Sequence, residues 1–120
     1  MSEMRARLQK VIDSLFGDGG DQPALRRAAA ARAATIGGGT LAAKETLPEG
    51  LAAWVDKVAR NAWKITDEDV AALRAAGFDE DTIFEVTIAA AAGAGVARYQ
   101  VATRAFEAAK SAPAKAKTGS

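Results

Sequence analysis

The side chains of this chain that could carry out chemistry are carboxylates, lysines, arginines and a single tyrosine, because its 120 residues include no cysteine and no histidine. This composition excludes thiol redox chemistry, zinc sites of the usual kind and imidazole acid–base catalysis. Three residues of the C-terminal third stand out: Glu85, Arg98 and Tyr99. Glu85 lies in a strongly apolar stretch, where burial would favour the neutral carboxyl and suit it to acid or base catalysis.

Glu85 has two interpretations. In the first, Glu85, Arg98 and Tyr99 share a pocket. Arg98 follows Glu85 by 13 residues and falls on a different face of one helix, so such a pocket would require a subunit interface or a bend. In the second, Glu85 forms a structural ion pair with an arginine of another helix, such as Arg60 or Arg74. The two interpretations differ in whether Glu85 faces a cavity or an arginine.

The stretch 77–106 must position these residues, and its composition predicts one long helix. Small residues run without a polar break from Ala89 to Gly95. Larger apolar side chains fall on both sides of the helical wheel: Ile83, Val86 and Val101 on one side, and Phe84, Ile88, Tyr99 and Phe106 on the other. A helix that is apolar nearly all round is buried. We therefore expect a buried helix whose neighbours approach closely at Gly95.

Shorter amphipathic helices are expected before it, at 3–16, 23–35, 48–63 and 66–76. The predicted fold is all-α, a bundle of about five helices. Its parts are N-terminal helices (1–36), a Gly-rich linker loop (37–47), a helical core (48–109) and a disordered tail (110–120).

The last two helices have explicit start and stop signals. Thr66 and Asp69 form a capping box, and Gly77 ends the short helix in the left-handed conformation. Asp79 caps the long helix that follows. These signals predict a tight helical corner at 77–79.

Trp63 lies outside the apolar stripe of its helix. It is interpreted either as an interface residue or as a side chain that covers the loop before Thr66. Tyr99 is more typical of an interface with a bonded hydroxyl than of a catalytic acid. The candidate oligomer-interface residues are Trp63, Ala91, Gly95 and Tyr99.

Charge and hydropathy limit the partners. The net charge is +1, so no global field attracts nucleic acid. Arg26, Arg27 and Arg32 form a basic cluster that is interpreted as a solvated face, because aromatic stacking partners are missing nearby. No cofactor, metal or membrane partner is predicted. The N-terminus does not resemble a signal peptide and 88–97 is too short to span a bilayer, so a cytoplasmic location is expected.

A resemblance to a known family rests on TDEDVAALRAAGFDEDTIFEVTIAAAAGAGVARYQVATRAFEA. Its features are AALRAAG, an acidic cap, IFE, and an alanine-rich run to Gly95 followed by Val96 and Ala97. In this order, over roughly 48–109, they resemble the core of the alkylhydroperoxidase D-like, carboxymuconolactone decarboxylase family. The resemblance implies an all-α bundle whose protomers associate through this core, commonly as trimers or hexamers.

Redox members of that family carry a Cys-x-x-Cys-x-x-x-His motif before the AALRAAG-like turn. Counted back from Gly77, its positions fall on Ala62, Ile65 and Asp69. An alanine and an isoleucine offer no thiolate, and Asp69 is already explained as a capping residue. The chain therefore resembles a degenerate member, for which cysteine-dependent peroxidase activity is impossible.

Three functions follow as hypotheses. The preferred one is a non-catalytic helical oligomer, a pseudoenzyme that serves as scaffold, partner subunit or small-ligand binder. The alternative is a decarboxylase-like acid–base enzyme acting on a small organic acid, with Glu85, Arg98 and Tyr99 in its pocket. The third is weak binding of nucleic acid or an anionic surface through the basic second helix and three tail lysines: Lys110, Lys115 and Lys117.

Overall fold

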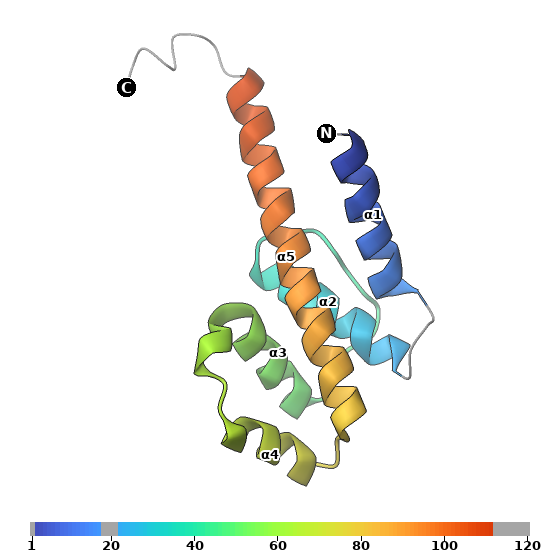
Figure 1. The fold of residues 1–120 in the computed structure, drawn as a ribbon, viewed down its shortest axis with the longest axis vertical. Coiled ribbons are helices and arrows are strands. Elements are labelled where there is room, and N and C mark those ends of the chain that lie inside the picture. Colours follow the sequence, from blue (N-terminus) through green and yellow to red (C-terminus); the bar gives the residue numbers. More distant parts are fainter. Residues whose placement is uncertain (1, 18–21, 112–120) are drawn as a thin grey trace.

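The computed structural model describes residues 2–17 and 22–111, and only the backbone of Ser2 and Met4. The helices are α1 (Ser2–Phe16), α2 (Pro23–Ile36), α3 (Glu49–Asn61), the short 3-10 helix η1 (Ala62–Lys64), α4 (Asp67–Ala75) and α5 (Glu80–Ser111). No strand occurs in the described residues, which confirms the predicted all-α fold of about five helices. Long α5 runs through the molecule, with α2 and α3 behind it and α1 and α4 beside it (Figure 1).

The contact between α2 and α5 is built from small residues. Ala30 and Ala33 of α2 and Ala90 of α5 are fully buried. Alanine side chains let two helix backbones approach closely, and Gly93 of α5 lies at such a close approach. A Cβ atom on Gly93 would lie 2.2 Å from the carbonyl oxygen of Ala30.

Close packing at Gly95 was the expectation, and within the chain it is wrong. A Cβ atom on Gly95 would meet no atom within 4 Å. The two glycines are 2 residues apart and therefore differ by about 200° around the helix. The face that carries Gly93 contacts α2, and Gly95 points away from it.

The glycine-rich segment after α2 is packed against α5 at several points. A Cβ atom on Gly39 would lie 2.7 Å from the Ala97 side chain. The backbone N–H of Thr40 donates to Oε1 of Gln100 at 3.1 Å. Arg104 Nη2 donates to the Gly38 carbonyl at 2.8 Å. This segment therefore joins the end of α2 to the C-terminal half of α5.

Larger side chains fill the space between α3 and α5. Leu51 and Val55 of α3 are fully buried, as is Val86 of α5. Trp54 is buried beside them and its indole Nε1 donates to Thr87 Oγ1 at 2.8 Å. A buried indole N–H requires such an acceptor, so Thr87 allows a tryptophan at this position in the core.

The predicted caps are confirmed. The Thr66 side chain accepts from the Asp69 backbone N–H while the Asp69 carboxylate accepts from the Thr66 backbone N–H. Gly77 has a φ of 102°, and Asp79 Oδ1 accepts from the Thr82 N–H at 2.8 Å. These local hydrogen bonds set the corner between α4 and α5.

Helix α5 is not buried all round, which corrects the expectation from its apolar wheel. Its side chains at Phe84, Ile88 and Phe106 are 67%, 53% and 55% exposed. The face toward α2 and α3 is buried, and the opposite face has no neighbour in the described part of the chain. The helix also continues to Ser111, so Lys110 is helical. The rest of the predicted tail, 112–120, lies outside the described residues.

Candidate functional site

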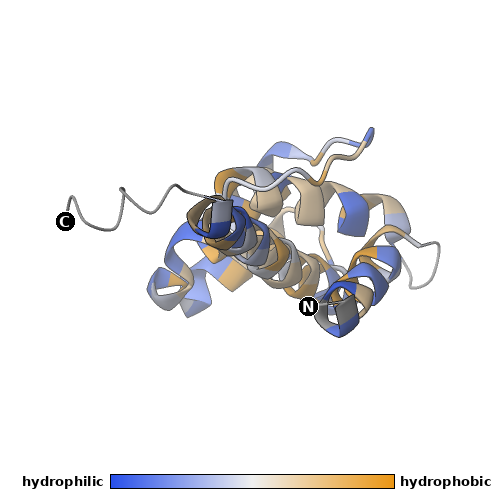
Figure 2. Ribbon diagram, turned by 90° about the horizontal axis from the view of Figure 1, so that it is seen from above, coloured by the Kyte–Doolittle hydropathy of each residue, from blue (hydrophilic) through white to orange (hydrophobic). Residues whose placement is uncertain are grey.

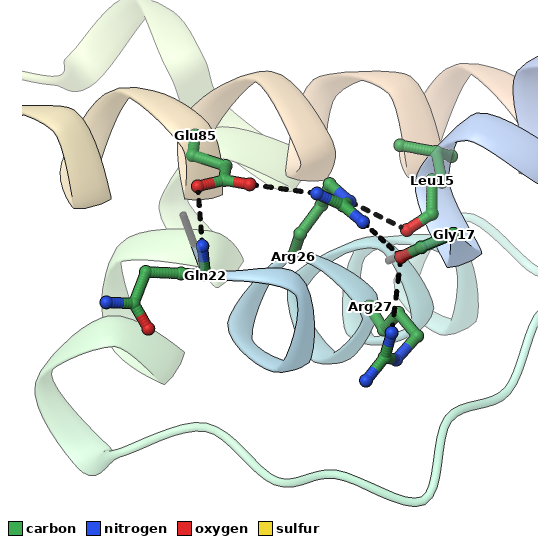
Figure 3. A network of polar contacts seen from close by, with 6 residues as sticks. All are labelled: Leu15, Gly17, Gln22, Arg26, Arg27 and Glu85. Carbon is green, nitrogen blue, oxygen red and sulfur yellow. Dashed lines mark hydrogen bonds and ion pairs between the residues drawn. The ribbon is translucent and has the colours of Figure 1, made fainter. Parts of the chain in front are cut away.

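Glu85 faces an arginine. Its Oε1 lies 2.9 Å from Nη1 of Arg26 on α2, and its Oε2 accepts from the backbone N–H of Gln22 at 3.1 Å (Figure 3). The Glu85 and Arg26 side chains are 17% and 11% exposed. Both carboxylate oxygens are therefore hydrogen-bonded in a largely dry site, where a lone charge would be strongly unfavourable.

Arg26 joins three helices. Its Nε donates to the Leu15 carbonyl at 3.0 Å, and its Nη2 donates to the Gly17 carbonyl (Figure 3). These are carbonyl groups at the end of α1, which the helix itself leaves unpaired. One guanidinium therefore caps α1 from α2 and neutralises Glu85 on α5.

This geometry supports the structural interpretation of Glu85, with a partner that the sequence did not indicate. Arg60 and Arg74 were the expected partners, and that expectation is wrong. Arg74 instead pairs with Glu80 at the start of α5. Arg26 was assigned to a solvated face, and its long reach across the α1–α2 junction had no local sequence signal.

Arg98 and Tyr99 do not join Glu85. Arg98 follows Glu85 by 13 residues on one helix, which separates them by about 20 Å along its axis. Arg98 Nη2 donates to the Ala59 carbonyl at 3.0 Å, near the end of α3. Tyr99 is half-buried in a groove between α1 and α5. The three residues of the suggested acid–base pocket are thus held at different places in one chain.

The residues at the three positions of the missing redox motif have either a structural role or no visible role. Ala62 is exposed in η1, and Ile65 packs at the edge of the core. Asp69 belongs to the capping box and its Oδ2 lies 2.7 Å from Lys57 Nζ. Two hydrogen bonds lower the pKa of Asp69 below its ordinary value: the one from the Lys57 ammonium has the larger effect, and the one from the Thr66 backbone N–H the smaller.

Acid should therefore weaken the α4 cap. A carboxyl whose pKa is lowered on folding stabilises the fold above its unfolded-state pKa, and this contribution is lost as the pH falls through the folded-state pKa. We expect Asp69→Asn to lower the thermal midpoint at pH 7 and to lower it less at pH 2, because the parent aspartate loses its charge as the pH falls through its folded-state pKa. Calorimetry from pH 7 to 2 measures this. An equal loss at both pH values would show that the charge of Asp69 is not what stabilises the cap.

The other arginines of α2 are also paired. Arg27 Nη2 lies 2.8 Å from Glu45 Oε2 in the loop before α3, and Arg32 Nε lies 2.6 Å from Asp56 Oδ1 on α3. These ion pairs border a cleft between α2, the loop and α3. The basic helix therefore uses its charges within the fold, which removes the main support for the nucleic-acid hypothesis. Lys115 and Lys117 lie outside the described residues.

The remaining candidate site is the exposed face of α5. Its apolar residues recur every three, four or seven positions, and we name them the α5 stripe: Phe84, Ile88, Ala91, Gly95, Ala102 and Phe106. All six are exposed. Ala91 and Gly95 were predicted interface residues and lie at the middle of the stripe. Tyr99 borders it, whereas Trp63 lies apart on η1, 79% exposed with Lys64 over its ring.

An uncovered apolar face is the feature of this surface that the sequence prediction missed. Its outer residues, Phe84, Ile88 and Phe106, were placed in a buried core because both sides of the wheel are apolar. The signal that could have separated the two faces is size. The face toward α2 carries alanine and glycine, while the exposed face has bulky side chains near its ends.

Comparison with known proteins adds no relative: no family model, curated protein or solved structure matches the chain. Within the described residues, no helix combines the length and apolar character needed to cross a bilayer.

Proposed function

We propose that this chain is a non-catalytic helical protein that acts by associating with another protein surface through the α5 stripe. The observation that carries the proposal is the exposure of Phe84, Ile88 and Phe106 on one face of a single helix. Contiguous exposed apolar surface of this kind is typical of interaction sites. A helix that presents such residues over about six turns offers a long, straight contact surface.

The acid–base alternative has weaker support. It requires Glu85 as an acid or base next to Arg98 and Tyr99, and Glu85 is instead hydrogen-bonded to Arg26 and Gln22. A catalytic carboxylate also needs access to substrate. The Glu85 side chain is only 17% exposed.

A fold of the alkylhydroperoxidase D-like type is part of the proposal. Its support is the order of a capped α4, a one-glycine corner and an alanine-rich α5, which follows the motif order of that family. The substitution of its redox motif by Ala62, Ile65 and Asp69 accounts for a non-catalytic role. Association as trimers or hexamers stays an expectation from this resemblance.

The test is the mass in solution, measured by light scattering at two protein concentrations. We expect a mass above the 12.4 kDa of one chain, rising with concentration. Ile88→Glu should weaken the association at least about tenfold, because a carboxylate would lie in an apolar contact, and tenfold corresponds to about 1.4 kcal/mol. Ala108→Glu is the matched control, because Ala108 is exposed on the opposite side of α5.

A single-chain mass at every concentration would exclude self-association. The stripe would then require a different protein as partner. Equal effects of Ile88→Glu and Ala108→Glu would contradict the assignment of the stripe as the contact surface.

A further inference from the structure

Four residues of the α5 stripe lie at equal distances on either side of Gly95. Phe84 precedes Gly95 by 11 residues and Phe106 follows it by 11. Eleven residues make about three helical turns, so both rings lie on the face of Gly95, each about 16 Å away along the axis. Ile88 precedes Gly95 by 7 residues, and Ala102 follows it by 7. A helix with this pattern presents apolar side chains at these same four positions when it is turned end over end.

One charged residue at each end of α5 follows the same symmetry with opposite sign. Glu80 precedes Gly95 by 15 residues and Lys110 follows it by 15. The first turn of α5 is acidic, with Asp81 and with Glu80, which also pairs with Arg74 of the same chain, and the last turn contains basic Lys110. In an antiparallel pair with the Gly95 residues opposite, each acidic turn faces the basic turn of the other copy. The helix dipoles are then also antiparallel. A parallel pair would bring like charges together.

We propose that the partner of the α5 stripe is a second copy of this chain, packed antiparallel about a two-fold axis near Gly95. This inference rests on the proposed function, association through the stripe. A two-fold interface requires a surface that is complementary to itself, which the apolar spacing and the end charges both provide. Gly95 lets the helices approach closely at the axis, and Phe84 of each copy meets Phe106 of the other.

The surroundings of the stripe leave room for a second helix. Helices α1 and α4 lie on either side of α5, and no described element covers the face between them (Figures 1 and 2). A groove lined by Leu8, Val11, Gly95 and Tyr99 runs along one edge of the stripe. Two charged residues lie near Gly95. The Arg98 guanidinium is hydrogen-bonded to the Ala59 carbonyl on α3, and Arg7 of α1 lines the same groove as Gly95.

Cysteine cross-linking tests the direction and register. The chain has no cysteine of its own, so single substitutions report one position each. In the proposed dimer, position 88 of one copy faces position 102 of the other, while the two copies of position 88 are about 21 Å apart. A disulfide requires Cβ atoms about 4 Å apart. We expect mild oxidation of mixed Ile88→Cys and Ala102→Cys full-length chains to give about ten times more cross-linked dimer than either variant alone.

Ala71→Cys, at an exposed position of α4, mixed with Ile88→Cys, is the control for random collision and should give no excess dimer. Cross-linking of each single variant with itself would show parallel helices and overturn the inference. A dimeric mass without cross-linking of the 88 and 102 mixture would overturn it as well, while association itself would stand. A single-chain mass for the parent chain would instead contradict both this inference and self-association.

Discussion

Gly93→Ala should destabilise the fold by about 2 kcal/mol. The added methyl group would lie 2.2 Å from the carbonyl oxygen and 2.8 Å from the Cα of Ala30, and these are backbone atoms of α2 that cannot turn aside. Overpacking of this kind costs about 3 kcal/mol, and the better helix propensity of alanine returns about 1 kcal/mol. Helix α2 would have to move away from α5 along their whole alanine contact. Urea unfolding followed by circular dichroism measures the loss.

Gly95→Ala is the matched control, with the opposite expected sign. It makes the same substitution on the same helix, where the methyl group meets no atom within 4 Å. The helix propensity alone then acts, and the fold should gain up to about 1 kcal/mol. Both variants should be measured at a concentration where the chain is monomeric. Equal effects of the two substitutions would contradict the close α2–α5 contact at Gly93.

Glu85→Gln should cost about 3 kcal/mol. The change removes the carboxylate that faces the Arg26 guanidinium at a largely buried position, and breaking a buried pair on one side is more harmful than replacing both partners. Replacing both residues, as Glu85→Leu with Arg26→Met, should therefore cost less than the sum of the two single changes. The coupling free energy comes from thermal and urea unfolding of four proteins: the parent chain, Glu85→Leu, Arg26→Met and the double variant.

The exposed pair Glu3–Arg7 provides the comparison. Its N–O distance of 3.0 Å is similar, but its side chains are 79% and 71% exposed. Solvent-exposed ion pairs contribute about 0–1 kcal/mol, so Glu3→Gln should leave stability almost unchanged. If Glu85→Gln were equally harmless, Arg26 and Glu85 would not form the dry junction described above.

Sequence patterns predicted those parts of the fold that depend on neighbouring residues. The Thr66–Asp69 box, the left-handed Gly77 and the Asp79 cap were all predictable, because each is decided by hydrogen bonds within five residues. Helix number and type followed from periodicity in the same way. The role of Gly77 in ending α4 can be read from the residues next to it in the sequence.

Features that depend on distant segments were not predictable. Gly93 and Gly95 both lie in the same alanine-rich run, and the sequence does not distinguish them. Only the position of α2 makes Gly93 crowded and leaves Gly95 open. The partner of Glu85 was missed for the same reason, since Arg26 lies 59 residues away. The candidate site was predicted in part. Ala91 and Gly95 were named as interface residues, but the exposure of Phe84 depends on which side of α5 the other helices cover.

The Arg26–Glu85 pair also has a consequence for the order of folding. Closing a loop of 59 residues is entropically unfavourable until other contacts hold its ends. The corner between α4 and α5 can form early from local contacts, whereas the junction of α1, α2 and α5 requires most of the chain to be in place. We expect such an interaction to form after the transition state. Its loss should accelerate unfolding and leave the folding rate almost unchanged, which makes the pair a determinant of the lifetime of the native state.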